Sequence, residues 1–203
     1  VTERVSRAEA TQRQGRAGRV APGVCYRLWT RGEEGALSAF APPEMLLADL
    51  AGLALELAAW GSDGTDLAFL TPPPAPALTE ARVLLTGLGA LDAAGRITAH
   101  GRALAALPLH PRLAHMLVIA GPGAAQLAAL LGERDPLSGA PSDLALRLAA
   151  IADPARYEAE HPHLVNRGIV ERVRLEAKRL ARLVKPGQAR FTLPEMGALA
   201  YPD

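Results

Sequence analysis

The chain of 203 residues has a single cysteine, Cys25, so it can form no internal disulfide. A reducing compartment suits such a chain, and we expect it in the cytoplasm. The sequence also has no marked excess of either charge, because 22 Lys and Arg oppose 21 Asp and Glu for a net charge of +1. Any nucleic-acid binding must therefore depend on local clusters of cations.

Long apolar runs are missing as well. Charged residues, glycine or proline interrupt each apolar stretch before the ~20 residues needed to span a bilayer, and no segment resembles a secretory signal. With 49% hydrophobic residues the chain can still bury a core, so we expect globular domains and no membrane partner. The chain opens with Val1 and stops at Asp203 without a closing element, so we expect a piece of a longer protein.

Local patterns at the start predict the remnant of an α/β domain, to about residue 40. Ser6 and Glu9 have the spacing of a capping box, which predicts a helix that ends near Gly18. The alternating residues 23–29 then predict a strand, with Cys25 as a buried core thiol.

Residues 41–108 have the order of elements of a winged helix. A helix is predicted from Pro43 to a stop at Gly61, Thr79 is expected to cap the next helix, and residues 92–98 are expected to form a small hairpin. The buried stripe of the first helix is predicted from leucines at steps of four and three, at Leu46, Leu50, Leu53, Leu57 and Trp60.

Short helical patterns fill the rest of the chain and predict a helical bundle at 109–186. The segments are 98–107, 113–120, 124–131, 143–151 and 164–184. Residues 187–203 are predicted as a linker into a further domain. The expected fold class is mainly α, with a small α/β remnant in front.

The segment with the clearest chemistry is Gln-Arg-Gln-Gly-Arg-Ala-Gly-Arg at 12–19. On a helix, Gln12, Arg16 and Arg19 fall at i, i+4 and i+7, so an amide and two guanidinium groups face the same way. Gly15 and Gly18 leave the adjacent surface without side chains. This arrangement suits a polyphosphate, although on charge alone a solvated helix end is the commoner explanation.

The pattern Q-R-x-G-R-x-G-R resembles the sixth conserved motif of superfamily 2 helicases. Its continuation at 23–28, Gly-x-Cys-Tyr-Arg-Leu, is similar to the DEAH-box ATP-dependent RNA helicases. Residues 44–57 and 69–74 resemble the first winged-helix segment and the proline-rich connector of that family, and 98–109 resembles the entry to its ratchet domain. His110, where many relatives have Asp, is typical of the bacterial HrpB-type branch.

The resemblance implies that residues 1–40 belong to a second RecA-like motor domain and that the intact protein uses ATP and Mg²⁺ on single-stranded RNA. Arg16 and Arg19 would be arginine fingers at the transferred γ-phosphate, and Gln12, Arg13 and Gly15 would complete the nucleotide-binding set.

The chain itself contains neither a G-x-x-x-x-G-K-[ST] phosphate loop nor an Asp-Glu-x-His magnesium box. We therefore expect it to hydrolyse no ATP alone and to bind no cofactor by itself. It would act with the first RecA-like domain of the same protein.

A row of cations marks the last long helix. Arg174, Lys178 and Arg182 could follow RNA phosphates, but Glu171 and Glu176 interrupt the row at pairing distance and also fit an ordinary solvated face.

Two other interpretations concern metal binding and an alternative function. The segment 161–163, His-Pro-His, has no further ligand nearby, so we predict no metal site. The alternative function is a stand-alone winged-helix nucleic-acid-binding module without ATPase activity. Residues 79–107 could support it alone, but they lack a basic recognition helix.

Overall fold

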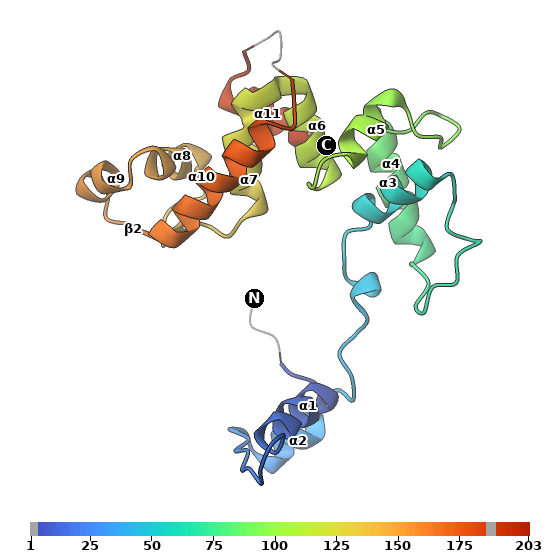
Figure 1. Ribbon diagram of the computed structural model, residues 1–203, viewed down its shortest axis with the longest axis vertical. Coiled ribbons are helices and arrows are strands. Elements are labelled where there is room, and N and C mark those ends of the chain that lie inside the picture. Colours follow the sequence, from blue (N-terminus) through green and yellow to red (C-terminus); the bar gives the residue numbers. More distant parts are fainter. Residues whose placement is uncertain (1–3, 186–189) are drawn as a thin grey trace. The chain divides into compact units, whose positions relative to one another are not determined.

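The computed structural model describes residues 4–185 and 190–203 of a mainly helical chain (Figure 1). Contacts between residues divide it into two units. Unit 1 comprises residues 1–48 and 69–74, and unit 2 comprises residues 49–68 and 75–203. The mainly α fold class expected from the sequence is confirmed.

The described part of unit 1, from residue 4 onward, contains two helices and one short helical turn. They are α1 (Arg7–Ala17), α2 (Arg31–Ala36) and the 3-10 turn η1 (Glu44–Leu46). The predicted capping box begins α1: the hydroxyl of Ser6 accepts the N–H of Glu9 at 3.2 Å, and the Glu9 carboxylate accepts the N–H of Ser6 at 2.7 Å. Both bonds satisfy donors that the first helical turn leaves free, and the helix ends at Gly18 as predicted.

The strand predicted for Gly23–Trp29 is wrong. Within the described part of unit 1 this segment pairs with no other strand, and Val24, Tyr26 and Leu28 are 75%, 83% and 92% exposed. The alternation of residue types is present, but a strand also needs a neighbour to receive its backbone hydrogen bonds. For the same reason Cys25, predicted to be buried, is exposed.

Unit 2 begins with three helices and a small hairpin. The helices are α3 (Ala51–Trp60), α4 (Ala75–Gly87) and α5 (Ala99–Ala105), and α3 packs on both of the others. Leu91 and Ile97 form an antiparallel bridge that closes the hairpin predicted for this stretch. Three helices and a hairpin are the arrangement of a winged helix.

The second part of unit 2 is a helical bundle. Its elements are α6 (Pro111–Ala120), the 3-10 turn η2 (Gly121–Ala124), α7 (Ala125–Gly132), β1 (Leu137–Ser138), α8 (Leu144–Ala152), α9 (Pro154–Glu160), β2 (Leu164–Val165), α10 (Arg167–Ala181) and α11 (Leu193–Ala200). The two strands pair antiparallel, α7 packs on α10, and α6 packs on α11. The predicted apolar side of α10 is buried through Ile169, Val173 and Leu180.

The run Pro111–Gly132 is apolar and long enough to cross a membrane by length and composition. It is interrupted by η2, and 67% of its most apolar window is buried within the unit. Its apolar side chains thus contribute to the core of the bundle.

The predicted start of the first helix of unit 2 is wrong. It predicted one helix from Pro43 to Trp60, but η1 and α3 are separate, and Leu46 and Trp60 are 51% and 80% exposed. Of the predicted stripe, Leu50 and Leu57 are buried as expected. Because α3 is apolar on nearly every side, leucine spacing alone does not identify its whole buried face, and the packing also buries Leu55.

Two further boundaries differ from the prediction. Helix α4 begins at Ala75, and Thr79, the predicted cap, lies inside it with its hydroxyl donating to the carbonyl of Ala75 at 2.9 Å. Residues 187–203, predicted as a linker, contain α11. The predicted stop at 185–187 lies partly outside the described residues, and α10 already ends at Ala181.

Candidate nucleotide and nucleic-acid sites

The arginine motif lies on the second half of α1 and just beyond it. Gln12, Arg13 and Arg16 are exposed on the helix, whereas Arg19 follows the end of the helix at Gly18. The predicted i+7 position of Arg19 on the helix is therefore wrong, because glycine ended the helix first. Arg19 is exposed directly after the cap.

The surface beside these cations is open. A Cβ added at Gly15 or Gly18 would meet no atom within 4 Å. Within the described residues, no carboxylate forms an ion pair with Arg16 or Arg19. Guanidinium groups beside a bare surface can donate to the oxygens of a phosphate.

A polar cluster connects α1 to the rest of unit 1. Nη2 of Arg27 donates to Oε1 of Gln14 at 2.9 Å, and Nη1 of Arg27 forms an ion pair with Glu34 on α2. The other carboxylate oxygen of Glu34 accepts the indole N–H of Trp29. This cluster was not predicted from the sequence, although Arg27 and Gln14 both lie within the segments that suggested the family.

The predicted RNA-binding row on α10 is divided by its contacts. Arg174 donates from Nε to the carbonyl of Ile151 at 2.9 Å, from Nη2 to that of Ala152 at 3.1 Å, and from Nη1 to Glu171 at 2.7 Å. These two carbonyls are among the last of α8, where a cation is favourable. Arg174 therefore has a structural role, while Lys178 and Arg182 are exposed.

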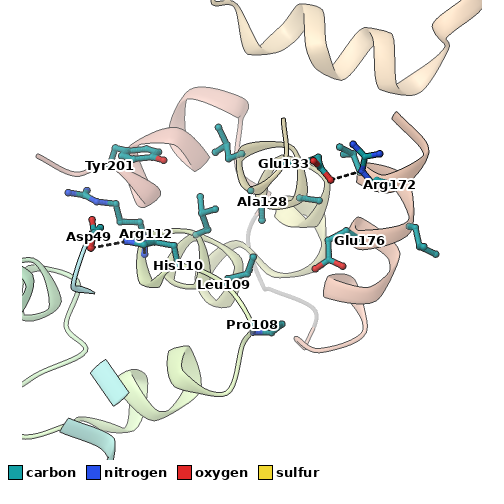
Figure 2. A pocket seen from close by; sticks show the side chains of 16 residues that line it. Asp49, Pro108, Leu109, His110, Arg112, Ala128, Glu133, Arg172, Glu176 and Tyr201 are labelled. Atoms are coloured by element: carbon teal, nitrogen blue, oxygen red, sulfur yellow. Dashed lines mark hydrogen bonds and ion pairs between the residues drawn. The ribbon is translucent and has the colours of Figure 1, made fainter. Parts of the chain in front are cut away.

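A hollow of about 820 Å³ lies within unit 2, where α6 begins (Figure 2). The ring Nδ1 of His110 accepts the N–H of Arg112 at 3.3 Å, which assigns the proton of a neutral ring to Nε2, 3.4 Å from the carboxylate of Asp49. Arg112 also binds both carboxylate oxygens of Asp203 at 2.7 Å and lies over the ring of Tyr201.

These contacts shift the acidic groups toward their charged forms. Partial burial acts to raise the pKa of Asp49, but the hydrogen bond from the Ala51 N–H and the nearby His110 and Arg112 outweigh it and leave the pKa lowered. The hydrogen bonds from Arg112 lower the pKa of Asp203 to about 2. Arg112 and Asp203 satisfy each other, whereas Nε2 of His110 approaches Asp49 without forming a hydrogen bond. This part of the hollow is a joint between helices. Its partners lie far apart in sequence, which is why local patterns could not identify it.

Metal-binding residues do not gather in the described ranges 4–185 and 190–203, where no group of three His, Cys, Asp or Glu could hold an ion. His161 instead stacks on Tyr157, with ring centroids 4.3 Å apart.

Residues 81–109 match the family model of the helicase associated domain (HA2), winged-helix. The ATP-dependent RNA helicase HrpB of Escherichia coli K12 is 44% identical over 139 residues, which are 66% of this chain and 17% of that protein. The human probable ATP-dependent RNA helicase DHX35 is 42% identical over 119 residues, 58% of this chain and 17% of that protein.

Solved structures give the same result over a longer range. The crystal structure of Escherichia coli DEAH/RHA helicase HrpB matches with a TM-score of 0.73 and 35% identity, over 100% of this chain and 24% of that one. This chain thus spans about a quarter or less of the length of these relatives. It is homologous to the C-terminal region of DEAH-type ATP-dependent RNA helicases and includes their winged-helix domain.

Proposed function

We propose that this chain is part of a bacterial, cytoplasmic ATP-dependent RNA helicase and supplies Arg16 and Arg19 as arginine fingers. The observation that carries the proposal is the outward face of α1, which presents Gln12 and Arg16 beside the bare surface at Gly15. Names of the relatives support the activity, since they are ATP-dependent RNA helicases.

Phosphoryl transfer explains why arginine is needed there. Negative charge develops on the oxygens of the transferred γ-phosphate, and a positioned guanidinium group stabilises it. ATP and Mg²⁺ would be bound mainly by the first RecA-like domain of the same protein, and this chain would add Gln12, Arg13, Arg16 and Arg19 from the opposite side.

Unit 2 would contribute to the grip on single-stranded RNA. Lys178 is exposed on α10 and Arg182 is exposed directly after its last residue, and both can follow a phosphate backbone. Arg174 belongs to this proposal only in part, because α8 already engages its guanidinium group.

The first test is RNA-stimulated ATP turnover of the intact protein that carries this sequence. Arg16→Ala should lower turnover by about 10³-fold or more while nucleotide binding is largely kept. Arg7→Ala is the matched control, because Arg7 is also an exposed arginine of α1 but lies outside the motif. Its turnover should stay within about twofold of wild type.

Equal turnover for Arg16→Ala and wild type would contradict the helicase proposal. The match of residues 81–109 to a winged-helix domain would then favour the alternative, a nucleic-acid-binding module without ATPase activity. Binding of duplex DNA of defined sequence by the chain would support that alternative.

A further inference from the structure

Helix α1 has two faces with different tasks. With 3.6 residues per turn, Ala10, Gln14 and Ala17 share one face at i, i+4 and i+7, while Gln12 and Arg16 lie on nearly the opposite one. Ala10 is only 4% exposed, so the start of the first face packs against the rest of unit 1, whereas Gln14 and Ala17, farther along that face, are exposed. The motif residues are therefore presented by a helix whose other side is held.

The segment that follows α1 contacts this face at two residues, Ala17 and Gln14. At Gly23 an added Cβ would lie 1.8 Å from the carbonyl oxygen of Ala17, so only glycine permits this approach. About one turn earlier on α1, Oε1 of Gln14 accepts a hydrogen bond from the side-chain Nη2 of Arg27 at 2.9 Å. Gln14 occupies the x in Q-R-x-G-R, a position to which the motif assigns no residue type.

Arg27 is itself fixed by α2. Its other terminal nitrogen forms an ion pair with Glu34, and Glu34 also accepts the indole N–H of Trp29. The side chains of Arg27 and Glu34 are 29% and 31% exposed, so solvent only partly competes for this pair. A planar guanidinium group can bridge two acceptors in this way, whereas the single ammonium of lysine fits such a fork poorly.

We propose that Arg27, acting through Gln14, is a positioning residue that sets the rotation of α1 about its axis and hence the direction of Arg16. This inference rests on the proposed function of Arg16. A helix with its side chains is about 10–12 Å wide, so a rotation of about 10° displaces a side-chain tip by about 1 Å. A displacement of that size can cost about 10²-fold in rate.

The test replaces Gln14 in the intact protein and measures RNA-stimulated ATP turnover. Gln14→Leu keeps a side chain of comparable bulk but removes the acceptor, and kcat should fall by about tenfold to 10²-fold with KM for ATP nearly unchanged. Gln14→Glu keeps an acceptor for Arg27 and should stay within about threefold of wild type. Arg27→Lys should behave like Gln14→Leu, because lysine has a single terminal nitrogen and cannot reach Gln14 and Glu34 with two separate ones.

The same substitution made in the Arg16→Ala variant distinguishes an effect on the position of Arg16 from a general folding defect. In a protein that already carries Arg16→Ala, adding Gln14→Leu should lower turnover by less than about twofold, because Gln14 acts through Arg16. An equal fold-loss in both backgrounds would overturn the proposal. So would full turnover of Gln14→Leu in a protein whose Arg16→Ala variant is impaired. If Arg16→Ala has no effect, the proposed function itself fails.

Discussion

Units 1 and 2 each contain a basic helix, but the arginines differ in what they contact. Arg16 on α1 and Arg19 just beyond its end are exposed and, in the described part of the chain, form no ion pair. On α10, Arg172, Arg174 and Arg179 each bind a glutamate at 2.6–2.9 Å. The two helices are both rich in arginine, but they differ in how many arginines remain unpaired and able to bind a phosphate.

The difference begins in the sequence. The motif on α1 contains no acidic residue, while α10 contains Glu171 and Glu176, each three residues before an arginine that it binds. Exposed pairs of this kind add little stability, but they occupy the donors that a phosphate would use. In a row of cations, only the side chains that are not paired with a carboxylate are therefore candidates for binding phosphate.

Binding of RNA is the most direct way to test this distinction on α10. The double variant Lys178→Ala with Arg182→Ala should weaken binding of a labelled single-stranded RNA by about tenfold, because two exposed phosphate contacts are lost. The slope of log affinity against log salt should become shallower by about 1.4. Fluorescence anisotropy of the intact protein over a salt series measures both quantities.

Arg179→Ala is the matched control for this double variant. Arg179 lies on the same helix, but Glu176 binds its Nε at 2.8 Å and its Nη2 at 2.6 Å. Its loss should change RNA affinity by less than about twofold. If Arg179→Ala weakens binding as much as the double variant, pairing with glutamate does not decide which cations bind RNA.

Arg174→Ala should act on stability and leave RNA affinity nearly unchanged. The variant removes the donors that bind the carbonyls of Ile151 and Ala152, the last ones of α8. We expect the free energy that protects α8 from local unfolding to fall by about 1 kcal/mol, since Arg174 remains about one-third exposed. Hydrogen exchange of the α8 amides measures this loss.

Arg182→Ala, examined in the same way, should leave exchange of α8 as in wild type. Faster exchange in Arg182→Ala, or unchanged exchange in Arg174→Ala, would mean that the contact with α8 contributes nothing measurable.

Local chemistry made much of unit 2 predictable. The helix predicted from residue 98, the stop at Gly61 and the apolar side of α10 follow from residues within one or two turns of each other. The family resemblance likewise came from contiguous residues. Predictions of this kind succeed because helix ends and amphipathic faces depend on short-range spacing.

Features that depend on distant partners could not be predicted. Residues 23–29 have the composition of a strand, yet no described segment pairs with them. His110 was noted as unusual, but nothing near it in sequence points to Asp49. Arg174 looked like Lys178 in the sequence, and only the position of α8 separates a structural arginine from an exposed cation.

The smallest predicted effect is a dependence on pH that belongs to unit 2 alone. All five histidines lie in that unit, and Nε2 of His100 is 2.8 Å from Nδ1 of His115. Burial lowers the pKa of both rings, and for His115 the nearby His100 lowers it further. Both rings therefore take up protons more readily in the unfolded chain.

The sign follows from these lowered pKa values. The stabilisation is complete above the unfolded pKa of about 6.5 and is lost as the pH falls below it. Because both rings are only half-buried, we expect the free energy of unfolding of unit 2 to fall by less than about 1 kcal/mol between pH 7.5 and 5.5. Urea titrations at these two pH values measure the loss.

Each unit has one tryptophan, Trp29 in unit 1 and Trp60 in unit 2, so fluorescence can follow the units separately. The Trp29→Phe protein reports unit 2, whose unfolding midpoint should fall at pH 5.5, and the Trp60→Phe protein reports unit 1, whose midpoint should not. Adding His100→Gln should flatten the dependence in unit 2, because His115 then has no titrating neighbour. An equal shift in both units would instead point to a general effect of acid and remove the histidine pair as its cause.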